Sequence, residues 1–532
     1  MSTHSASSPF TGALATPHAL ATEAGVRAYR DGGSAIDAAI AAAAVLTVVY
    51  PHNVALGGDL IALVRTPDGA IRCVNASGWA GAAVDADRLR ESHGQWLPAR
   101  GADTVTVPGG VRGWETLRRM GARLTWARTL EPAELAARAG VPVSRSLVTH
   151  LVDAENADLF GTDDFDRVFR PRGRTLGETD ALVQPALADT FGALRHNGPD
   201  DFYEGTLAEQ TVTYLRGRGS SSTVDDFAAF QPETVDPISV DFGGLTVWTS
   251  PPNTHGFLML RALRAADVLG IDRPLTDGLG DLMRIFHQGN ALRATHLADP
   301  RHADVDVAAL VEGDLRELAE LGAGQQGPSW VPSGDTVGVS AADSDGYAVS
   351  LIQSVYHAFG SGLIDPATGV LFHNRGTSFS LDPSSPNVIA PRKRPAHTLM
   401  PAMTTHRGRL RHVLSTMGGQ GQPQILAQVL LRALDGISAE AAVSAPRAIV
   451  GRQVDGNTTD SVTVEADLTP SAMASITRAG LTSSVVPAHT EALGQANVVF
   501  VDAGESMTAA SDPRSDGAAV VAHHPRPITL QE

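Results

Sequence analysis

The stretch from residue 34 to 49, SAIDAAIAAAAVLTVV, constrains the fold more than any other part of the chain. Ser34 stands three residues before Asp37, the spacing of a helix N-cap followed by an acidic residue in the first turn. The helix that follows is alanine-rich and apolar almost all round, so it has no face that favours water. We therefore expect it to be buried between layers of other secondary structure.

The flanking segments predict a chain of helices and strands. A helix precedes it and ends at a glycine pair, and two strands joined at Asp68-Gly69 follow it. Residues from about 105 to 330 are mostly amphipathic helix, broken by the strand pair ISVDFGGLTVWTSPP. Residues 322 to 335, GAGQQGPSWVPSGD, are typical of an exposed loop or disorder. Strands, a glycine-rich turn and a helix come after it, which predicts a sheet-containing α/β protein with helices in the outer layers.

Composition excludes several classes of function. The formal charge of -17 argues against nucleic acid or an anionic membrane as a partner. Lys393 is the single lysine, which removes a P-loop lysine elsewhere, and Cys73 is the single cysteine, which leaves no disulfide framework. The first residues lack the pattern of a secretory signal, and the longest apolar run is shorter than a membrane span. We expect a soluble, cytoplasmic protein.

One hairpin raises a chemical question. In SGDTVGVSAADSDGYAVSLIQS, residues 333 to 354, two β-rich runs flank the turn Asp345-Gly346, and Thr336 begins the first strand. Thr336 is either an ordinary strand residue or the new N-terminus of a chain that cuts itself. Cleavage before Thr336 would give its hydroxyl a neighbouring α-amine as a base. The Gly418-Gly419 turn some eighty residues later offers backbone N–H donors for an oxyanion.

A series of motifs resembles the gamma-glutamyltranspeptidase family of N-terminal-nucleophile hydrolases over nearly the whole chain. They appear in that family's order, and each is quoted as it stands here: ATEAGVRAYRDGGSAIDAAIAAAAVLTVVYPHNVALGGD, DFYEGTLAEQTV, STVDDFAAF, TSPPNTHG, DTVGVSAADSDGYAVSLIQSVYHAFGSGLIDPATGVLFHN, RKRPAHTLMPAM and MGGQGQP. The order and number of these motifs make the resemblance specific.

The resemblance implies an α+β fold, a four-layer αββα sandwich made as one precursor. It implies cleavage between Asp335 and Thr336, giving a large subunit of residues 1–335 and a small one of residues 336–532 that stay associated. Thr336 takes the position of the nucleophile, and Ser354 that of a hydroxyl residue that binds the nucleophile and assists processing. Gly418 and Gly419 take the position of the oxyanion pair. No metal and no organic cofactor is expected.

The sequence departs from the family where its glutathione-cleaving members grip the glutamyl head. Asn75 stands near the place of the arginine that pairs with the α-carboxylate, and Ser378 stands where an acid binds the ammonium. His397 and Thr398 replace a serine pair, while Arg375 would repel the ammonium. Since a buried charge without its partner costs several kcal/mol, glutathione is an unfavourable substrate.

These departures favour a different acyl group. Arg375, His373 and His397 are candidates to receive a carboxylate or oxalyl-like group. The alternative for Arg375 is that it faces solvent or pairs with a nearby acid. Tyr356, at the end of the hairpin, is a further candidate substrate contact. A catalytic metal is not expected at His373, His397, His406 and His412, which show no metal-binding motif.

The sequence thus predicts a self-processing N-terminal threonine hydrolase or acyltransferase for a small amide or acyl substrate. Oxamate-, glutaryl- and cephalosporin-acylase-like activities fit. Three alternatives stay open: a C–C bond hydrolase of actinobacterial alkylproline antibiotic pathways, a true gamma-glutamyl transferase, and a non-catalytic protein that binds an anion at MGGQGQP.

Overall fold

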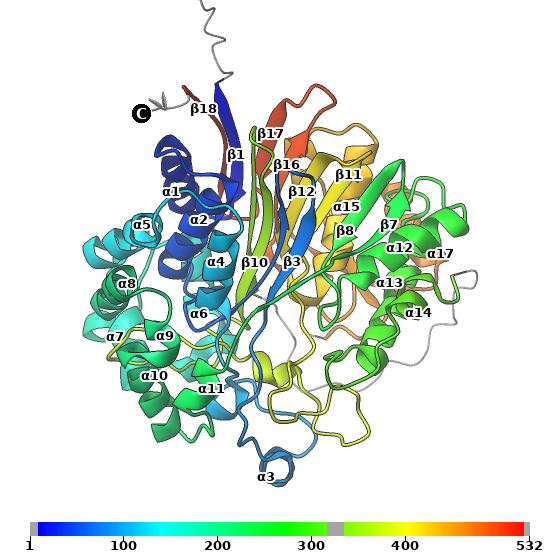
Figure 1. The fold of residues 1–532 in the computed structure, drawn as a ribbon. Helices are drawn as coiled ribbons and strands as arrows, with labels where there is room; N and C mark the ends of the chain where they lie inside the picture. Colours follow the sequence, from blue (N-terminus) through cyan, green and yellow to red (C-terminus); the bar gives the residue numbers. More distant parts are fainter. Residues whose placement is uncertain (1–8, 316–334, 455, 526–532) are drawn as a thin grey trace, which may run out of the picture.

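The structure is a computed structural model of the chain, and it describes residues 9–315, 335–454 and 456–525. Figure 1 shows two large sheets face to face, with helices on both outer sides. Most of the loop predicted for residues 322–335 lies outside the described residues; only Asp335 falls within them.

The first sheet has seven strands, and each neighbouring pair is antiparallel. Their order across the sheet is β18 (Ala518–His524), β1 (Phe10–Thr16), β9 (Asp335–Asp343), β10 (Ala348–Tyr356), β2 (Asp59–Arg65), β3 (Ile71–Ala76) and β6 (Glu233–Val235). The predicted hairpin is its centre, because β9 and β10 lie between β1 and β2. Strands from before and after residue 335 are therefore neighbours within one sheet.

The second sheet has six strands and packs on the first. Their order is β17 (Met507–Ser511), β16 (Gln495–Val501), β12 (Arg409–Met417), β11 (Ala402–His406), β8 (Leu245–Thr249) and β7 (Ile238–Phe242). The predicted strand pair at 238–249 is confirmed as β7 and β8. The two sheets meet through β9, which lies against β12 and β16.

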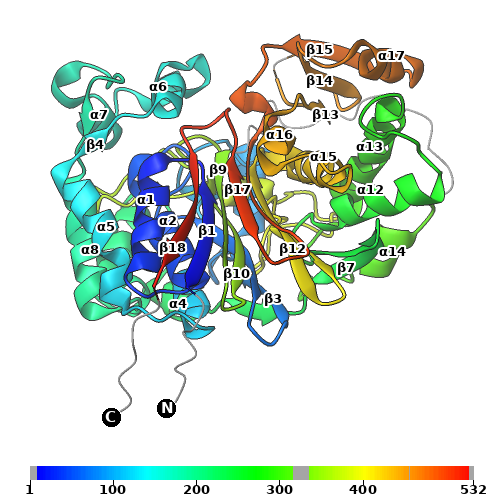
Figure 2. The same ribbon diagram turned by 90° about the horizontal axis from the view of Figure 1, so that it is seen from above.

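Helices cover the outer face of each sheet, as Figure 2 shows from above. The first sheet is covered by α1 (Ala19–Arg30), α2 (Ala35–Val49) and α4 (Gly110–Arg119), with α5 (Trp126–Ala139) and α8 (Pro185–Asn197) outside them. The second sheet is covered by α12 (Phe257–Val268), α15 (Gln422–Leu434) and α16 (Ala439–Ser444), with α13 (Leu279–His296) packed on α12. The four-layer αββα sandwich is therefore confirmed.

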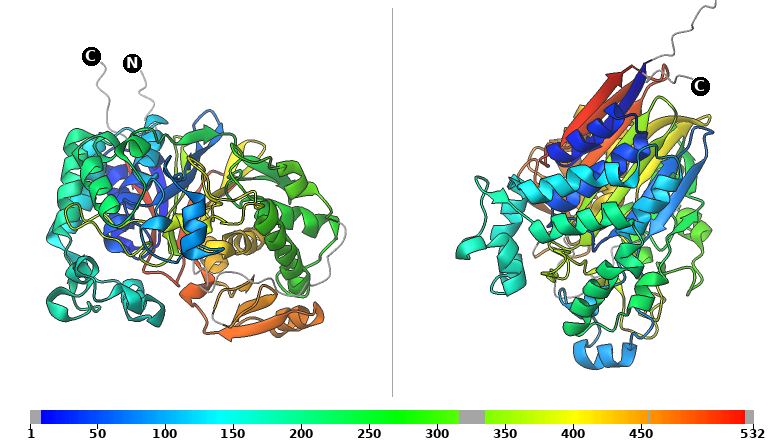
Figure 3. Two further views of the ribbon diagram at one scale, coloured as in Figure 1. Left: turned by 90° about the horizontal axis from the view of Figure 1, so that it is seen from below. Right: turned by 60° about the vertical axis from the view of Figure 1, so that its left-hand side comes forward.

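Smaller elements surround this sandwich (Figure 3). The helices are α3 (Ala86–His93), α6 (Arg145–Val152), α7 (Asp163–Phe169), α9 (Asp201–Glu204), α10 (Thr206–Gly217), α11 (Val224–Ala228), α14 (Val307–Glu312) and α17 (Pro470–Arg478). The strands form one sheet of β13 (Ala448–Val450), β14 (Ser461–Glu465) and β15 (Thr482–Val486), and one of β4 (Val141–Pro142) and β5 (Ala181–Leu182).

The prediction for the alanine-rich helix is confirmed. Every residue of α2 is buried, because the helix lies between the first sheet and α5. Its start is fixed by Asp37, whose Oδ2 accepts the backbone N–H of Ser34 at 2.8 Å. Small alanine side chains let the sheet and α5 approach the helix closely, so this segment sets the spacing of the first helical layer.

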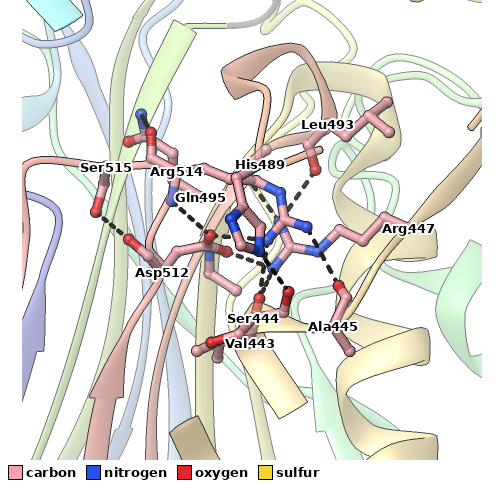
Figure 4. A network of polar contacts seen from close by, with 12 residues as sticks. Val443, Ser444, Ala445, Arg447, His489, Leu493, Gln495, Asp512, Arg514 and Ser515 are labelled. Carbon is pink, nitrogen blue, oxygen red and sulfur yellow. Dashed lines mark hydrogen bonds and ion pairs between the residues drawn. The ribbon is translucent and has the colours of Figure 1, made fainter. Parts of the chain in front are cut away.

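A buried ionic network ties the peripheral three-stranded sheet to the sandwich (Figure 4). Arg447 and Arg514 are fully buried and share the carboxylate of Asp512, and Arg514 Nε also donates to Glu465 Oε1 at 2.8 Å. Arg447 Nη1 donates to the carbonyl of Gly494 at 2.9 Å, just before β16. The network thus links β14, β16 and the end of β17.

Across the described ranges 9–315, 335–454 and 456–525, no helix combines the length and the apolar character that crossing a membrane requires.

Candidate active site

Thr336 lies buried at the start of β9, next to Ser354 on β10. Thr336 Oγ1 donates to Ser354 Oγ at 3.1 Å, and the backbone N–H of Tyr356 donates to the same oxygen at 2.7 Å. Ser354 Oγ in turn donates to the carbonyl oxygen of Asp335 at 2.7 Å. One serine hydroxyl thereby joins the Thr336 hydroxyl to the carbonyl of the preceding peptide bond, using its donor and both acceptor positions.

The contact between the sheets places Thr336 relative to the glycine turn. Ser340 Oγ lies 2.9 Å from Ser415 Oγ, and a Cβ on Gly338 would lie 2.8 Å from the backbone N of Thr416. Alternate residues of a strand share a face, so Thr336 faces the second sheet as these two residues do. Residues nearer the start of β9 lie opposite residues nearer the end of β12, where the glycine turn begins.

That turn requires glycine. Gly418 follows β12 with φ +138°, and Gly419 has φ +49° and opens the short helix η5 (Gly419–Gly421) that leads into α15. The first N–H groups of a helix have no partner within it, so they are available to an anion. Gly494, which Arg447 holds, backs the turn, because a Cβ on Gly418 would lie 3.5 Å from the Gly494 Cα.

A cavity of about 310 Å³ adjoins both the hairpin and the turn. Its walls include four residues that the sequence proposed for substrate binding, Tyr356, Ser378, His397 and Thr398, together with Gln420 directly after the glycine pair. Asn75, His373 and Arg375 are not among its described wall residues. The short loop between 379 and 393 borders it through Ser380, Ser385 and Asn387.

Arg375 lies behind this wall and does not face solvent. Its guanidinium stacks on the Tyr356 ring at 3.7 Å and donates to the Ser378 and Thr398 hydroxyls at 3.2 Å each. Burial lowers its pKa to about 10, so it stays cationic at neutral pH. No carboxylate of the described chain lies within ion-pair distance of it. Arg375 thus brings a positive charge beneath three residues of the cavity wall, without a direct ion pair, although the charge of Asp59 acts on it from farther away.

Tyr356 holds an unusual backbone conformation for an aromatic residue, with φ +82°. It stands where the β9–β10 pairing shifts register between Gln353 and Tyr356. The irregularity turns its N–H toward Ser354 and its ring toward the cavity and Arg375. Strained backbone of this kind concentrates at functional sites, where the surrounding structure holds it.

His373 and His397, which we expected to bind a substrate carboxylate, contact the carboxylate of Asp59 instead. His397 Nε2 lies 3.1 Å and His373 Nδ1 3.5 Å from Asp59 Oδ2. The N–H of Leu399 donates to His397 Nδ1, so the ring proton is on Nε2 and points at Asp59. Burial and the nearby charge of Arg375 lower the pKa of His397 to about 3. His397 therefore presents a neutral ring to the cavity.

Asp59 stays ionised in this arrangement. Burial alone would raise its pKa, but His373 and His397 outweigh burial and hold the pKa well below its usual range. His373 Nε2 is engaged by the carbonyl of Thr106 at 2.9 Å. Asn75 is likewise committed within the protein, since its Nδ2 donates to Asn253 Oδ1 at 2.9 Å. His406 and His412, which are close to His373 and His397 in the sequence, bond elsewhere. His406 Nδ1 is 2.9 Å from the Gly244 carbonyl, and His412 Nδ1 is 2.7 Å from Thr404 Oγ1.

The wall residues that the sequence did not predict include an arginine and a tryptophan. Arg293 of α13 lines the cavity, and its Nη2 donates to Gln420 Oε1 at 2.6 Å. Burial lowers its pKa to about 10, and no described carboxylate pairs with it. Trp96, a half-exposed side chain on the loop after α3, lines the cavity too. Neither stands in a motif, and only the fold brings them to the hairpin.

Comparison with known proteins identifies the family of the chain. The gamma-glutamyltranspeptidase family model matches residues 21–522. The chain is 36% identical over 521 residues to the glutathione hydrolase-like YwrD proenzyme of Bacillus subtilis, covering 95% of this chain and 98% of that protein. It is 35% identical over 530 residues to the oxamate amidohydrolase proenzyme of Klebsiella pneumoniae, covering 97% and 99%.

A solved structure matches over the same extent. The cephalosporin acylase from Bacillus halodurans superposes with a TM-score of 0.88 at 31% identity, covering 96% of each chain. The family model and these relatives confirm the resemblance derived from the motifs. The chain belongs to the gamma-glutamyltranspeptidase family, whose members are N-terminal-nucleophile hydrolases.

Proposed function

We propose that this protein is a self-processing threonine amidohydrolase whose small substrate carries a carboxylate on its acyl part and is not a glutamyl compound. The observation that carries the proposal is the chain of hydrogen bonds from Thr336 through Ser354 to the Asp335 carbonyl. It joins a hydroxyl nucleophile, a proton carrier and the peptide bond that is to break.

Self-cleavage uses this chain of bonds directly. The Thr336 oxygen bonds to the Asp335 carbonyl carbon, while Ser354 takes the hydroxyl proton and passes its own to the carbonyl oxygen. The C–N bond then breaks, the proton ends on the Thr336 nitrogen, and an ester remains. Water hydrolyses the ester, leaving Asp335 as a carboxylic acid and Thr336 with a free amine and hydroxyl.

Turnover repeats the attack on a substrate. An α-amine titrates near 7.7–8.0, so a useful fraction is neutral at pH 7 and accepts the hydroxyl proton. The N–H groups of the Gly418-Gly419 turn stabilise the oxyanion, and one such donor typically contributes about 2.7–4 kcal/mol. The amine portion of the substrate leaves with the proton, and water releases the acyl group.

The charge of the cavity supports an anionic acyl group. Arg293 lines it, Arg375 lies beneath its wall, and its described walls hold no carboxylate. A glutamyl ammonium would be repelled by the charges of these two guanidinium groups, whereas a carboxylate would be attracted by them. Relatives named as an oxamate amidohydrolase and a cephalosporin acylase agree with a non-glutamyl amide.

Matched amides test this proposal. Ammonia release is measured for oxamate, succinamate and glutaramate against the neutral diamides oxamide, succinamide and glutaramide, and glutamate release is measured for glutathione. A hydrogen bond to a charged group contributes about 1.5–3 kcal/mol, so at least one monoamide should exceed its diamide in kcat/KM by tenfold or more. Thr336→Ala should abolish turnover. Preference for glutathione, or turnover by Thr336→Ala, would contradict the proposal.

The assembly and location follow as parts of the same proposal. After cleavage the fragments 1–335 and 336–532 remain a heterodimer, because each contributes strands to both sheets. A single, buried cysteine is consistent with a cytoplasmic enzyme. A role in secondary metabolism fits a cavity that has lost the glutamyl-binding pattern.

A further inference from the structure

The side chain of Asp335, next to the bond proposed to break, contacts a histidine outside the hydrolytic machinery. His150 belongs to α6, and its Nε2 lies 3.3 Å from Asp335 Oδ1. Both side chains are largely buried, at 14% and 7% exposure. The other carboxylate oxygen, Oδ2, is buried and has no hydrogen-bond partner among the described residues.

The protonation of His150 follows from its second nitrogen. Nδ1 lies 2.9 Å from the carbonyl oxygen of Ser146, and a carbonyl only accepts, so Nδ1 carries a proton. If the ring were neutral, Nε2 would present a lone pair to the carboxylate and repel it. The contact with Asp335 is therefore attractive only when His150 is an imidazolium. Burial disfavours that charge, but Asp335 and Glu491 outweigh burial and raise the pKa of His150 to about 9.

His150 carries the positive charge in a cluster that it forms with His52, Ser146, Asp335 and Glu491. Its ring lies tilted against that of His52, with the ring centroids 4.6 Å apart. Burial together with the charge of His150 lowers the pKa of His52, so that ring is neutral. Ser146 Oγ lies 2.9 Å from His52 Nε2 and donates to Glu491 Oε2 at 2.7 Å. His150 thus contacts the carboxylate of Asp335 and also feels the charge of Glu491.

Further charges surround this cluster. Asp516 acts on Glu491 from the segment before β18. Arg100 feels the charge of Asp335 but pairs with Asp158 at 3.3 Å. The direct ion pair of Asp335 within the described chain is the one with His150.

We propose that His150 is a positioning residue for self-cleavage, which holds the Asp335 side chain and offsets its charge beside the carbonyl that is attacked. This inference rests on the proposed self-processing. Attack by Thr336 places negative charge on the Asp335 carbonyl oxygen before Ser354 completes proton transfer. An uncompensated carboxylate on the same residue opposes that charge, and the imidazolium removes the opposition.

The test follows cleavage of the full chain on denaturing gels, after rapid purification, for wild type, His150→Gln, Asp335→Asn and the double variant. His150→Gln should slow cleavage roughly tenfold or more, the change that about 1.4 kcal/mol of barrier produces. The double variant should be faster than His150→Gln, because asparagine carries no charge to offset. If the double variant is as slow as His150→Gln or slower, the charge-offset role is wrong.

The chain offers a matched control in a second histidine–aspartate pair. His93 Nε2 lies 2.9 Å from Asp103 Oδ2 on α3 and η1 (Ala102–Thr104). His93→Gln removes a similar pair and should cleave at the wild-type rate; equal slowing would make the effect general destabilisation and overturn the proposal. Turnover per cleaved molecule should be the same in His150→Gln as in wild type.

The pH dependence of the cleavage rate separates a charge effect of His150 from a loss of packing, because a loss of packing would not vary with pH in this way. The ratio of wild-type to His150→Gln cleavage rates should be largest below pH 9 and fall toward one above it, as His150 loses its proton. A ratio independent of pH would overturn the proposal. A wild-type chain that never cleaves would instead refute the proposed self-processing, whereas cleavage of His150→Gln at the wild-type rate refutes this inference alone.

Discussion

The hydroxyl of Ser354 does more in this chain than a strand serine usually does. It accepts from Thr336 Oγ1 and from the Tyr356 N–H, and it donates to the Asp335 carbonyl. Its donor and both lone pairs are used, so nothing is spare for a water or a neighbouring side chain. This fixes the direction of proton flow from the nucleophile to the carbonyl oxygen.

Ser354→Ala should slow self-cleavage by about 10²–10³, the usual effect of losing one donor to a developing oxyanion. Ser350→Ala is a matched control on the same strand, since its hydroxyl donates to the Leu414 carbonyl at 2.6 Å, away from the cleavage site. The half-time of precursor disappearance on a denaturing gel measures both. Equal half-times for the two variants would refute a special role for Ser354.

Arg293 is the residue on which we expect acyl specificity to depend. Arg293→Gln should raise KM about tenfold or more for the preferred monoamide and change little for its neutral diamide, because only the carboxylate loses its partner. Arg293→Lys keeps the charge and should recover part of the loss. Steady-state ammonia release measures this, and a similar loss on both substrates would assign Arg293 a structural role instead.

At the scale of elements, the turn between β12 and α15 is the least replaceable piece. Gly418→Ala should reduce turnover by about 10²–10³, because an alanine at φ +138° forces the N–H donors out of place. Gly436→Ala, at φ +78° with no atom near its added Cβ, carries the backbone strain without touching the site. Comparable turnover in the two cleaved proteins would show that the turn has no oxyanion role.

The buried network at β14, β16 and β17 is the second element-scale feature. Asp512→Asn should lower the free energy of unfolding by about 3–5 kcal/mol, since it leaves Arg447 and Arg514 buried with less compensation. Glu505→Gln breaks the exposed pair with Arg409 and should cost under about 1 kcal/mol. Urea titration measures the loss of stability in both variants. Near-equal unfolding midpoints for the two variants would contradict a large contribution of the network to stability.

For the whole molecule, local segments of the sequence predicted sheets with helices in the outer layers, whereas the four-layer αββα arrangement was implied by the resemblance to the family. The alanine-rich helix is apolar almost all round and must be buried between other elements, and the Asp345-Gly346 turn joins the two strands of the central hairpin. The site was predictable only in part. Thr336, Ser354 and the glycine pair stand in motifs, but Arg293 and His150 lie on helices far from Thr336 in the sequence.

Two histidines show where prediction of the site from the sequence fails. His373 and His397 suggested carboxylate ligands, yet both face Asp59, which no sequence pattern connected to them. Pairings of this kind depend on loops that meet only after the two sheets have packed. Spacing along the chain carries no information about them.

Each proposed step requires that the backbone opens between Asp335 and Thr336. Intact mass with N-terminal sequencing of the freshly purified protein tests this directly. We predict two fragments whose masses sum to the 55.5 kDa chain plus one water, the smaller beginning with Thr336, and a single uncut chain for Thr336→Ala. A fully active wild-type protein that remains one polypeptide, or a Thr336→Ala chain that still splits at this bond, would contradict it.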